Sequence, residues 1–142
     1  MRYYAIHRFN TLLVVLAALL LDPAVRVVAD PLDLDRYRGE HPVIVIYALK
    51  ADEPRAFSFN LALSSEWDRI ESRRIRTIDV GPNQYDLESI GRQLGVAGEE
   101  FAVVLVGLDG EIIHRTTDPD ALSRILMILD QELNGDHDSR SG

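Results

Sequence analysis

An unbroken apolar run at residues 42–49 is the feature that most limits how this chain can fold. The run is Pro-Val-Ile-Val-Ile-Tyr-Ala-Leu and is rich in β-branched residues. A strand with one solvent-facing side would carry a polar residue at every second position, so this run predicts a strand that is buried on both faces. A sheet built around such a strand needs a covering layer on each side, which predicts an α/β architecture.

The remaining elements follow in an order that defines the sheet. Strands are predicted at residues 75–80, 101–106 and 111–115, and helices at residues 55–72, 86–94 and 118–134. The last two strands flank Gly107-Leu108-Asp109-Gly110, which is a strong hairpin signal. The predicted order is therefore β-α-β-α-β-β-α. We expect a mixed four-stranded sheet in which the second strand is parallel to the first, the third is antiparallel to it, and helices cover both faces.

The stretch after the first strand allows two interpretations. The residues from Phe57 to Leu63 alternate like a strand, whereas Phe59, Leu63, Trp67 and Ile70 recur at helical spacing. We predict a helix with these four residues in the core, because two buried parallel strands usually need a helical crossover between them.

Polar residues at both ends of this helix have structural interpretations. We expect Asp52 to cap its start and Pro54 to occupy its first turn. Arg69, Arg73 and Arg74 fall at its end, where cations complement the helix dipole. A functional basic patch is the alternative interpretation of these three arginines.

The first 29 residues have the pattern of a secretory signal. Arg2 and Arg8 precede an apolar run at residues 11–21, and Val27-Val28-Ala29 stands before the predicted cut. The apolar run is 11 residues long, whereas a membrane-spanning helix needs about 20. We predict a signal peptide at residues 1–29, a domain at 30–135 and a disordered polar tail at 136–142. An uncleaved N-terminal anchor is the alternative, and either predicts a periplasmic or secreted domain.

Composition narrows the partners and the chemistry. The chain has no cysteine, which excludes disulfides and thiol nucleophiles. Without its signal the chain carries 12 basic and 22 acidic residues, a formal net charge near −10. Such a surface repels nucleic acid and anionic lipid, so we expect cationic or neutral partners. Membrane attachment is expected only through an uncleaved signal segment.

Three segments carry a resemblance to a known family. They are residues 42–55 (PVIVIYALKADEPR), 73–81 (RRIRTIDVG) and 101–118 (FAVVLVGLDGEIIHRTTD), the last followed by an amphipathic helix. The chain resembles the DUF4174 family over about residues 31–133. That family is a thioredoxin-like domain of unknown function, found in short exported bacterial proteins and within some larger animal extracellular proteins. The resemblance implies a thioredoxin-like three-layer α/β/α fold and supplies no activity.

A thioredoxin would place two cysteines at the start of the helix after the first buried strand. Ala51 and Pro54 stand at about those positions here, and Glu99-Glu100-Phe101 stands where a thioredoxin has a proline. Neither Ala51 nor Pro54 can form a thiolate, so thiol–disulfide exchange and cysteine-based peroxide reduction are excluded.

The default site is the edge of the sheet at the carboxyl ends of the parallel strands, where α/β proteins bind ligands. The candidate binding residues at this edge are Lys50, Asp52, Glu53, Asn83, Tyr85, Glu99 and Glu100. The alternative is structural, with Asp52 as a helix cap and the glutamates as solubilising loop residues.

We predict a non-catalytic binding module, with no catalytic residue and no cofactor. The competing hypothesis is an enzyme that uses carboxylates at this edge. Glu53, Glu99 and Glu100 could converge on a cation such as Ca²⁺, but their spacing does not require one and no metal site is predicted. A third possibility is that the strand at residues 111–115 pairs with another chain.

Overall fold

The computed structural model describes residues 31–139, so the predicted signal peptide lies outside the described residues. Within them no helix is long and apolar enough to cross a membrane. The elements in chain order are η1 (Asp35–Tyr37), β1 (Val43–Ala48), α2 (Pro54–Ser65), α3 (Trp67–Ser72), β2 (Arg76–Val80), α4 (Leu87–Leu94), β3 (Phe101–Val106), β4 (Ile112–Thr116) and α5 (Leu122–Ser139).

The four strands form one mixed sheet in the order β2-β1-β3-β4. β1 pairs parallel with β2 and antiparallel with β3, and β3 pairs antiparallel with β4. The predicted element order and strand directions are confirmed. Every residue of β1 and β3 is buried, as the apolar runs predict.

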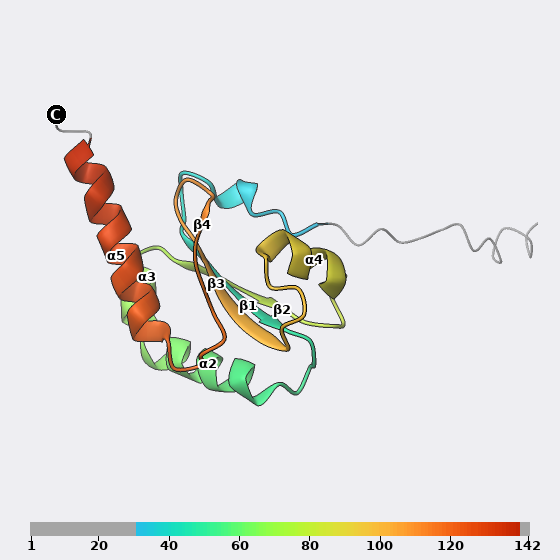
Figure 1. Cartoon of the computed structure of the whole chain (residues 1–142). Helices are drawn as coiled ribbons and strands as arrows, with labels where there is room; N and C mark the ends of the chain where they lie inside the picture. Colours follow the sequence, from blue (N-terminus) through green and yellow to red (C-terminus); the bar gives the residue numbers. More distant parts are fainter. Residues whose placement is uncertain (1–30, 140–142) are drawn as a thin grey trace, which may run out of the picture.

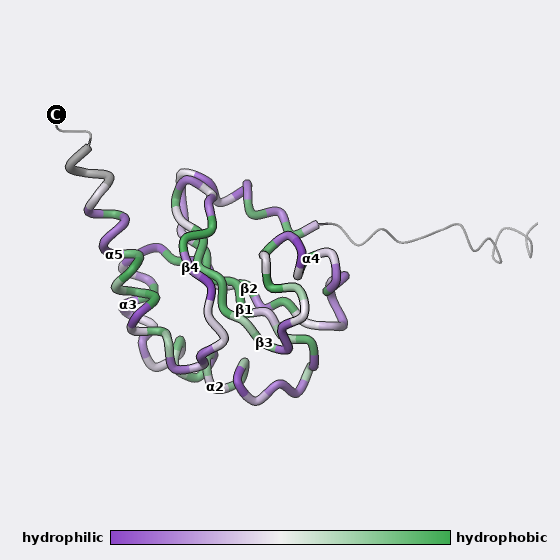
Figure 2. The backbone as a smooth tube through the Cα atoms, viewed as in Figure 1, coloured by the Kyte–Doolittle hydropathy of each residue, from purple (hydrophilic) through white to green (hydrophobic). Residues whose placement is uncertain are grey.

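Helices cover both faces of the sheet, with α2, α3 and α5 on one side and α4 on the other (Figure 1). Alternate side chains of the central strands serve the two layers. Ile44 and Ile46 join the core under α2, α3 and α5, whereas Val43, Val45 and Tyr47 join the core under α4. The hydrophobic colouring in Figure 2 follows these central strands.

The predicted crossover is helical, so the strand interpretation of its first half is wrong. It is nevertheless two helices, because the chain breaks at Glu66. The hydroxyls of Ser64 and Ser65 donate to the Asn60 and Ala62 carbonyls at 3.0 and 2.8 Å, and such local bonds compete with helix continuation.

This break changes which side chains reach the core. Phe59, Leu63 and Ile70 are buried as predicted. Trp67, the fourth residue of the predicted stripe, is 54% exposed. Its placement in the core is therefore wrong, because the change of direction at Glu66 interrupts the helical spacing on which the prediction rested.

The arginines after the break have separate partners. Arg73 donates to the Arg69 carbonyl at 2.8 Å, which fits the predicted role at a helix end. Arg73 also forms two hydrogen bonds with Asp130 of α5, and Arg69 pairs with Glu66. Arg74 has a φ of 54°, so it turns the chain into β2.

Both predicted ends of the last helix are wrong. α5 begins at Leu122, after a turn in which the Asp118 carboxylate accepts from the Asp120 amide at 2.9 Å. It also continues through Asn134 and Gly135 to Ser139, so residues 136–139 extend the helix rather than belong to a disordered tail. Gly135 lacks the positive φ that a terminating glycine would adopt.

Candidate functional site

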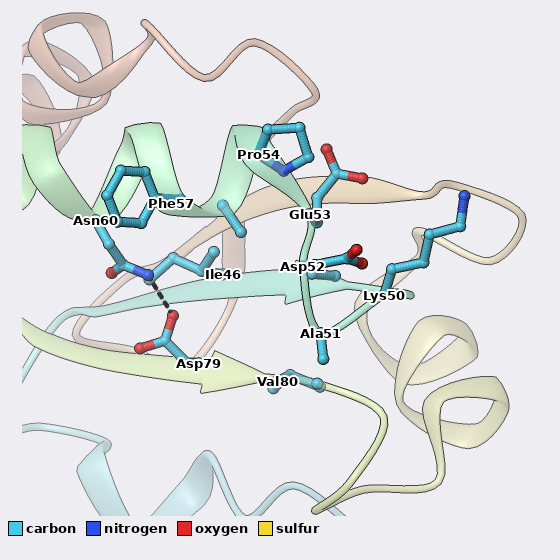
Figure 3. A pocket seen from close by; sticks show the side chains of 13 residues that line it. Ile46, Lys50, Ala51, Asp52, Glu53, Pro54, Phe57, Asn60, Asp79 and Val80 are labelled. Atoms are coloured by element: carbon cyan, nitrogen blue, oxygen red, sulfur yellow. Dashed lines mark hydrogen bonds between the residues drawn. The ribbon is translucent and has the colours of Figure 1, made fainter.

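A hollow of about 490 Å³ lies between the start of α2 and the carboxyl ends of β1 and β2 (Figure 3). It is at the sheet edge that the sequence predicts. Its lining residues are Ile46, Ala48, Lys50, Ala51, Asp52, Glu53, Pro54, Ala56, Phe57, Asn60, Asp79, Val80 and Gly81. The wall is thus mainly apolar, with a few polar groups, as is usual for small-ligand sites.

Glu53, rather than Asp52, caps α2. The Glu53 carboxylate accepts from the Arg55 amide at 3.3 Å. The predicted cap was one residue too early, because Pro54 is the first helical residue and the cap is the residue directly before it. Asp52 is left at the hollow as an exposed side chain without this structural role.

The Glu53 side chain is also held by the guanidinium of Arg55. Arg55 Nε and Nη2 donate to Glu53 Oε1 and Oε2 at 2.6 and 3.1 Å. Glu53 is 7% exposed. The hydrogen bond from the Arg55 side chain lowers the pKa of Glu53 and outweighs the opposing effect of burial. Glu53 is therefore an ionised structural anchor.

Arg55 extends this anchor to the start of β3. Its Nη2 lies 3.5 Å from Glu100 Oε2, and its guanidinium lies 5.4 Å from the centre of the Phe101 ring. Lys50 Nζ lies 3.5 Å from Glu100 Oε1. Glu53 and Glu100 thus share the guanidinium of Arg55 as a partner, and Lys50 joins them through Glu100. Within the described residues no group of three histidine or carboxylate side chains is placed to hold a metal ion.

Two polar side chains in the hollow were not predicted from the sequence. Asn60 Nδ2 on α2 donates to Asp79 Oδ1 on β2 at 2.8 Å (Figure 3). Asp79 lies opposite Ile46 in the sheet, on the face that α2 covers. A carboxylate between Ile78 and Val80 is the sequence signal that could have identified it, since it stands near the carboxyl end of a predicted strand, where α/β proteins bind ligands.

Four of the seven predicted site residues do not line the hollow, although one of them, Glu100, pairs with the lining residue Lys50. Asn83 and Glu99 are exposed and do not line the hollow. Tyr85 packs against the core under α4 and borders a separate hollow with Tyr37 and Ile78. The loop after β2 therefore turns toward the opposite face of the sheet, and the seven candidates do not form one site.

The lining supports binding better than covalent chemistry. It contains no hydroxyl, thiol or imidazole side chain, and the Lys50 amine, the one lining nucleophile other than the carboxylates, lies 3.5 Å from Glu100 Oε1 in an ion pair. The polar groups that the hollow offers to a ligand are the Asp52 carboxylate and the hydrogen-bonded pair of Asn60 and Asp79. They lie beside the exposed ring of Phe57.

Comparison with solved structures identifies the fold. The chain is similar to the reduced 2-Cys peroxiredoxin of Plasmodium vivax, with a TM-score of 0.59 and 15% identity over 73% of this chain and 84% of that one. It is also similar to Plasmodium yoelii Prx1a, with a TM-score of 0.57 and 17% identity over 73% and 80% of the two chains. A thioredoxin of Fasciola hepatica aligns with a TM-score of 0.48 and 14% identity over 67% and 84%.

The two peroxiredoxin similarities confirm the predicted thioredoxin-like α/β fold. No family model matches the chain, and no curated protein matches its sequence. At such identities the likeness extends to the fold alone. The chain has this fold without any cysteine.

Proposed function

We propose that this chain is an exported, thioredoxin-like binding module of the DUF4174 type, without catalytic activity, whose ligand occupies the hollow between α2 and β2. The observation that supports it best is the composition of that hollow. An apolar wall with an exposed aromatic ring lies beside three carboxylates, of which Glu53 is paired with Arg55, and no thiol, hydroxyl or imidazole accompanies them. This combination gives affinity and orientation without a serine, threonine, cysteine or histidine nucleophile.

The charges around the hollow favour a cationic or neutral ligand, either a small molecule or a side chain of a protein partner. Asp52 and Asp79 contribute negative charge, while the nearby cations Lys50 and Arg55 are paired with Glu100 and Glu53. The start of α2 is also closed to anions, because Pro54 has no amide hydrogen and Glu53 accepts from the Arg55 amide.

A carboxylate-dependent enzyme is the competing function, and it would use carboxylates of this edge, with Glu53 among them. A general acid among carboxylates needs a raised pKa. The pKa of Glu53, the most buried carboxylate of the edge, is shifted the other way. This direction supports the binding function over acid catalysis by Glu53.

Three probes that share one ring test the ligand class. They are benzylammonium, benzyl alcohol and benzoate, each titrated into the ¹⁵N-labelled domain. We expect benzylammonium and benzyl alcohol to shift the amides of Phe57, Asn60 and Asp79, and benzoate to leave them unchanged. Asp79→Asn keeps a carbonyl for Asn60 to bond but removes the charge. It should weaken benzylammonium binding about 3- to 10-fold and leave benzyl alcohol binding nearly unchanged.

Asp120→Asn is the matched control, since Asp120 is an exposed carboxylate in the turn before α5. It should bind all three probes like the unmodified domain. Shifts of equal size with benzoate, or shifts away from the hollow, would contradict the proposed site. A probe that is chemically changed by the domain, and unchanged by Asp79→Asn, would favour the enzyme.

A further inference from the structure

We propose that the free edge of β2 is an interface for a second copy of this chain, which pairs with it antiparallel about a two-fold axis. This proposal goes beyond the binding of a ligand in the hollow. In the part of the chain that the structure describes, β2 is an edge strand whose sole neighbour in the sheet is β1. Unpaired edges recruit other strands unless the chain protects them.

The backbone of β2 presents a regular row of outward groups. The Arg76 amide donates to the Pro42 carbonyl, on the β1 side, at 2.9 Å. Since the direction of backbone groups alternates along a strand, Thr77 and Asp79 direct theirs away from β1. The pairing of β1 with β2 is continuous from Arg76 to Val80, without a bulge.

The opposite edge differs from this one. The pairing of β4 with β3 is interrupted between Leu105 and Val106, and such irregularities disrupt the pairing of further strands. β2 has no proline and no lysine, and its two charged residues are Arg76, at its first position, and Asp79. A charge such as the Asp79 carboxylate can prevent another strand from pairing, but the hydrogen bond with Asn60 directs this carboxylate toward α2.

Exposed apolar side chains accompany this edge on the helical side. Leu61 of α2 is 62% exposed, and Trp67 of α3 is 54% exposed. Trp67 lines the same hollow as Arg76, at the amino end of β2. Leu61 directly follows Asn60, which bonds to Asp79 near the carboxyl end. A second sheet continued from β2 would bring its own α2 and α3 against these side chains.

Charge selects a second copy in antiparallel orientation. Arg74 and Arg76 outnumber the single carboxylate, Glu71, at the amino end of β2, and Asp52, Glu53 and Asp79 outnumber the single cation, Lys50, at its carboxyl end. A two-fold axis places the basic end of each copy beside the acidic end of the other. With Ile78 on the axis, the outward groups of Thr77 meet those of Asp79 in the second copy, and the two Ile78 residues face each other as a non-hydrogen-bonded pair.

A single introduced cysteine tests this register, because the chain has no other thiol. In a non-hydrogen-bonded pair the facing Cα atoms are about 4.5 Å apart, which is within the range that a disulfide spans. Ile78→Cys should form a covalent dimer under mild oxidation with glutathione disulfide. Met127→Cys, on the outer side of α5 and 54% exposed, should remain mostly monomeric.

Sedimentation of the unmodified domain tests the dimer without a crosslink. We expect a rise toward twice the monomer mass up to about 1 mM protein. Thr77→Pro removes an outward amide and should abolish the rise, since proline is tolerated at that position of an edge strand. Leu61→Lys should weaken the dimer at least 10-fold with unchanged circular dichroism, and Met127→Lys should not.

Three results would overturn the proposal. One is a monomeric mass for the unmodified domain throughout this range. Another is equal crosslinking of Ile78→Cys and Met127→Cys. The third is a dimer that persists in Leu61→Lys and in a folded Thr77→Pro variant, which would assign association to another surface.

Discussion

Arg73 and Asp130 join α3 to α5 through two short hydrogen bonds, from Nε to Oδ1 at 2.7 Å and from Nη2 to Oδ2 at 2.8 Å. The Arg73 side chain is 22% exposed and the Asp130 side chain 42%. The bond from Arg73 lowers the pKa of Asp130 despite the opposing effect of partial burial. A carboxyl with a lowered folded-state pKa stabilises the fold above its unfolded pKa of about 3.9 and loses that contribution as the pH falls.

Asp130→Asn should therefore lower the free energy of unfolding at pH 7 by about 0.5–1 kcal/mol, a range reduced for solvent screening. The difference should shrink between about pH 5 and pH 3, because Asp130 becomes protonated in the original chain. Urea unfolding at both pH values measures this change. Glu88→Gln, in the highly exposed pair with Arg92, is the control and should stay within about 0.5 kcal/mol. An Asp130→Asn deficit that is equal at pH 7 and pH 3 would contradict the linkage.

At the scale of elements, two glycines have opposite roles at helix ends. Gly95 closes α4 with a φ of 69°. A Cβ there would lie 2.9 Å from Arg115 Nε, whose hydrogen bond to the Leu94 carbonyl joins β4 to the end of α4. Gly95→Ala should lower the free energy of unfolding by about 1–2 kcal/mol, from the left-handed backbone conformation, with further cost from crowding.

Gly135→Ala is the matched comparison. Gly135 lies within α5, and a Cβ added there would meet no atom of another element within 4 Å. Alanine should raise helix stability there by about 0.5–1 kcal/mol, because glycine is the poorer helix former. Far-ultraviolet circular dichroism during thermal unfolding separates the two effects. Destabilisation by Gly135→Ala would imply that the helix does not continue past Asn134.

Hydrophobic periodicity predicted the elements well, because the apolar runs of the central strands and the apolar spacing of α4 and α5 each fit one type of secondary structure. It failed where hydrogen bonds from side chains to the nearby backbone determine where a helix ends. The serine hydroxyls before Glu66 end α2 early and expose Trp67. The candidate residues were brought together only in part: strand order pointed to the edge at which the hollow lies, but the direction of the loop carrying Asn83 and Tyr85 depends on tertiary packing.

For the whole molecule, the proposed export makes a direct prediction. The full chain, expressed with a C-terminal tag in a Gram-negative bacterium, should yield a periplasmic form whose intact mass begins at Asp30. Ala29→Arg should block cleavage, because the residue before the cut must be small, and should retain the chain in the membrane fraction. An uncleaved original chain in that fraction would support the N-terminal anchor, and one in the cytoplasm would contradict export.

The two apolar layers of this molecule are built on the same two strands. Odd and even positions of β1 face different helices, and β3 behaves likewise. A side chain lost beneath α5 therefore loosens the backbone that also supports α4, so damage on one face is transmitted to the other. Neither layer has strands of its own with which to persist alone, and the domain should lose both together in one cooperative transition.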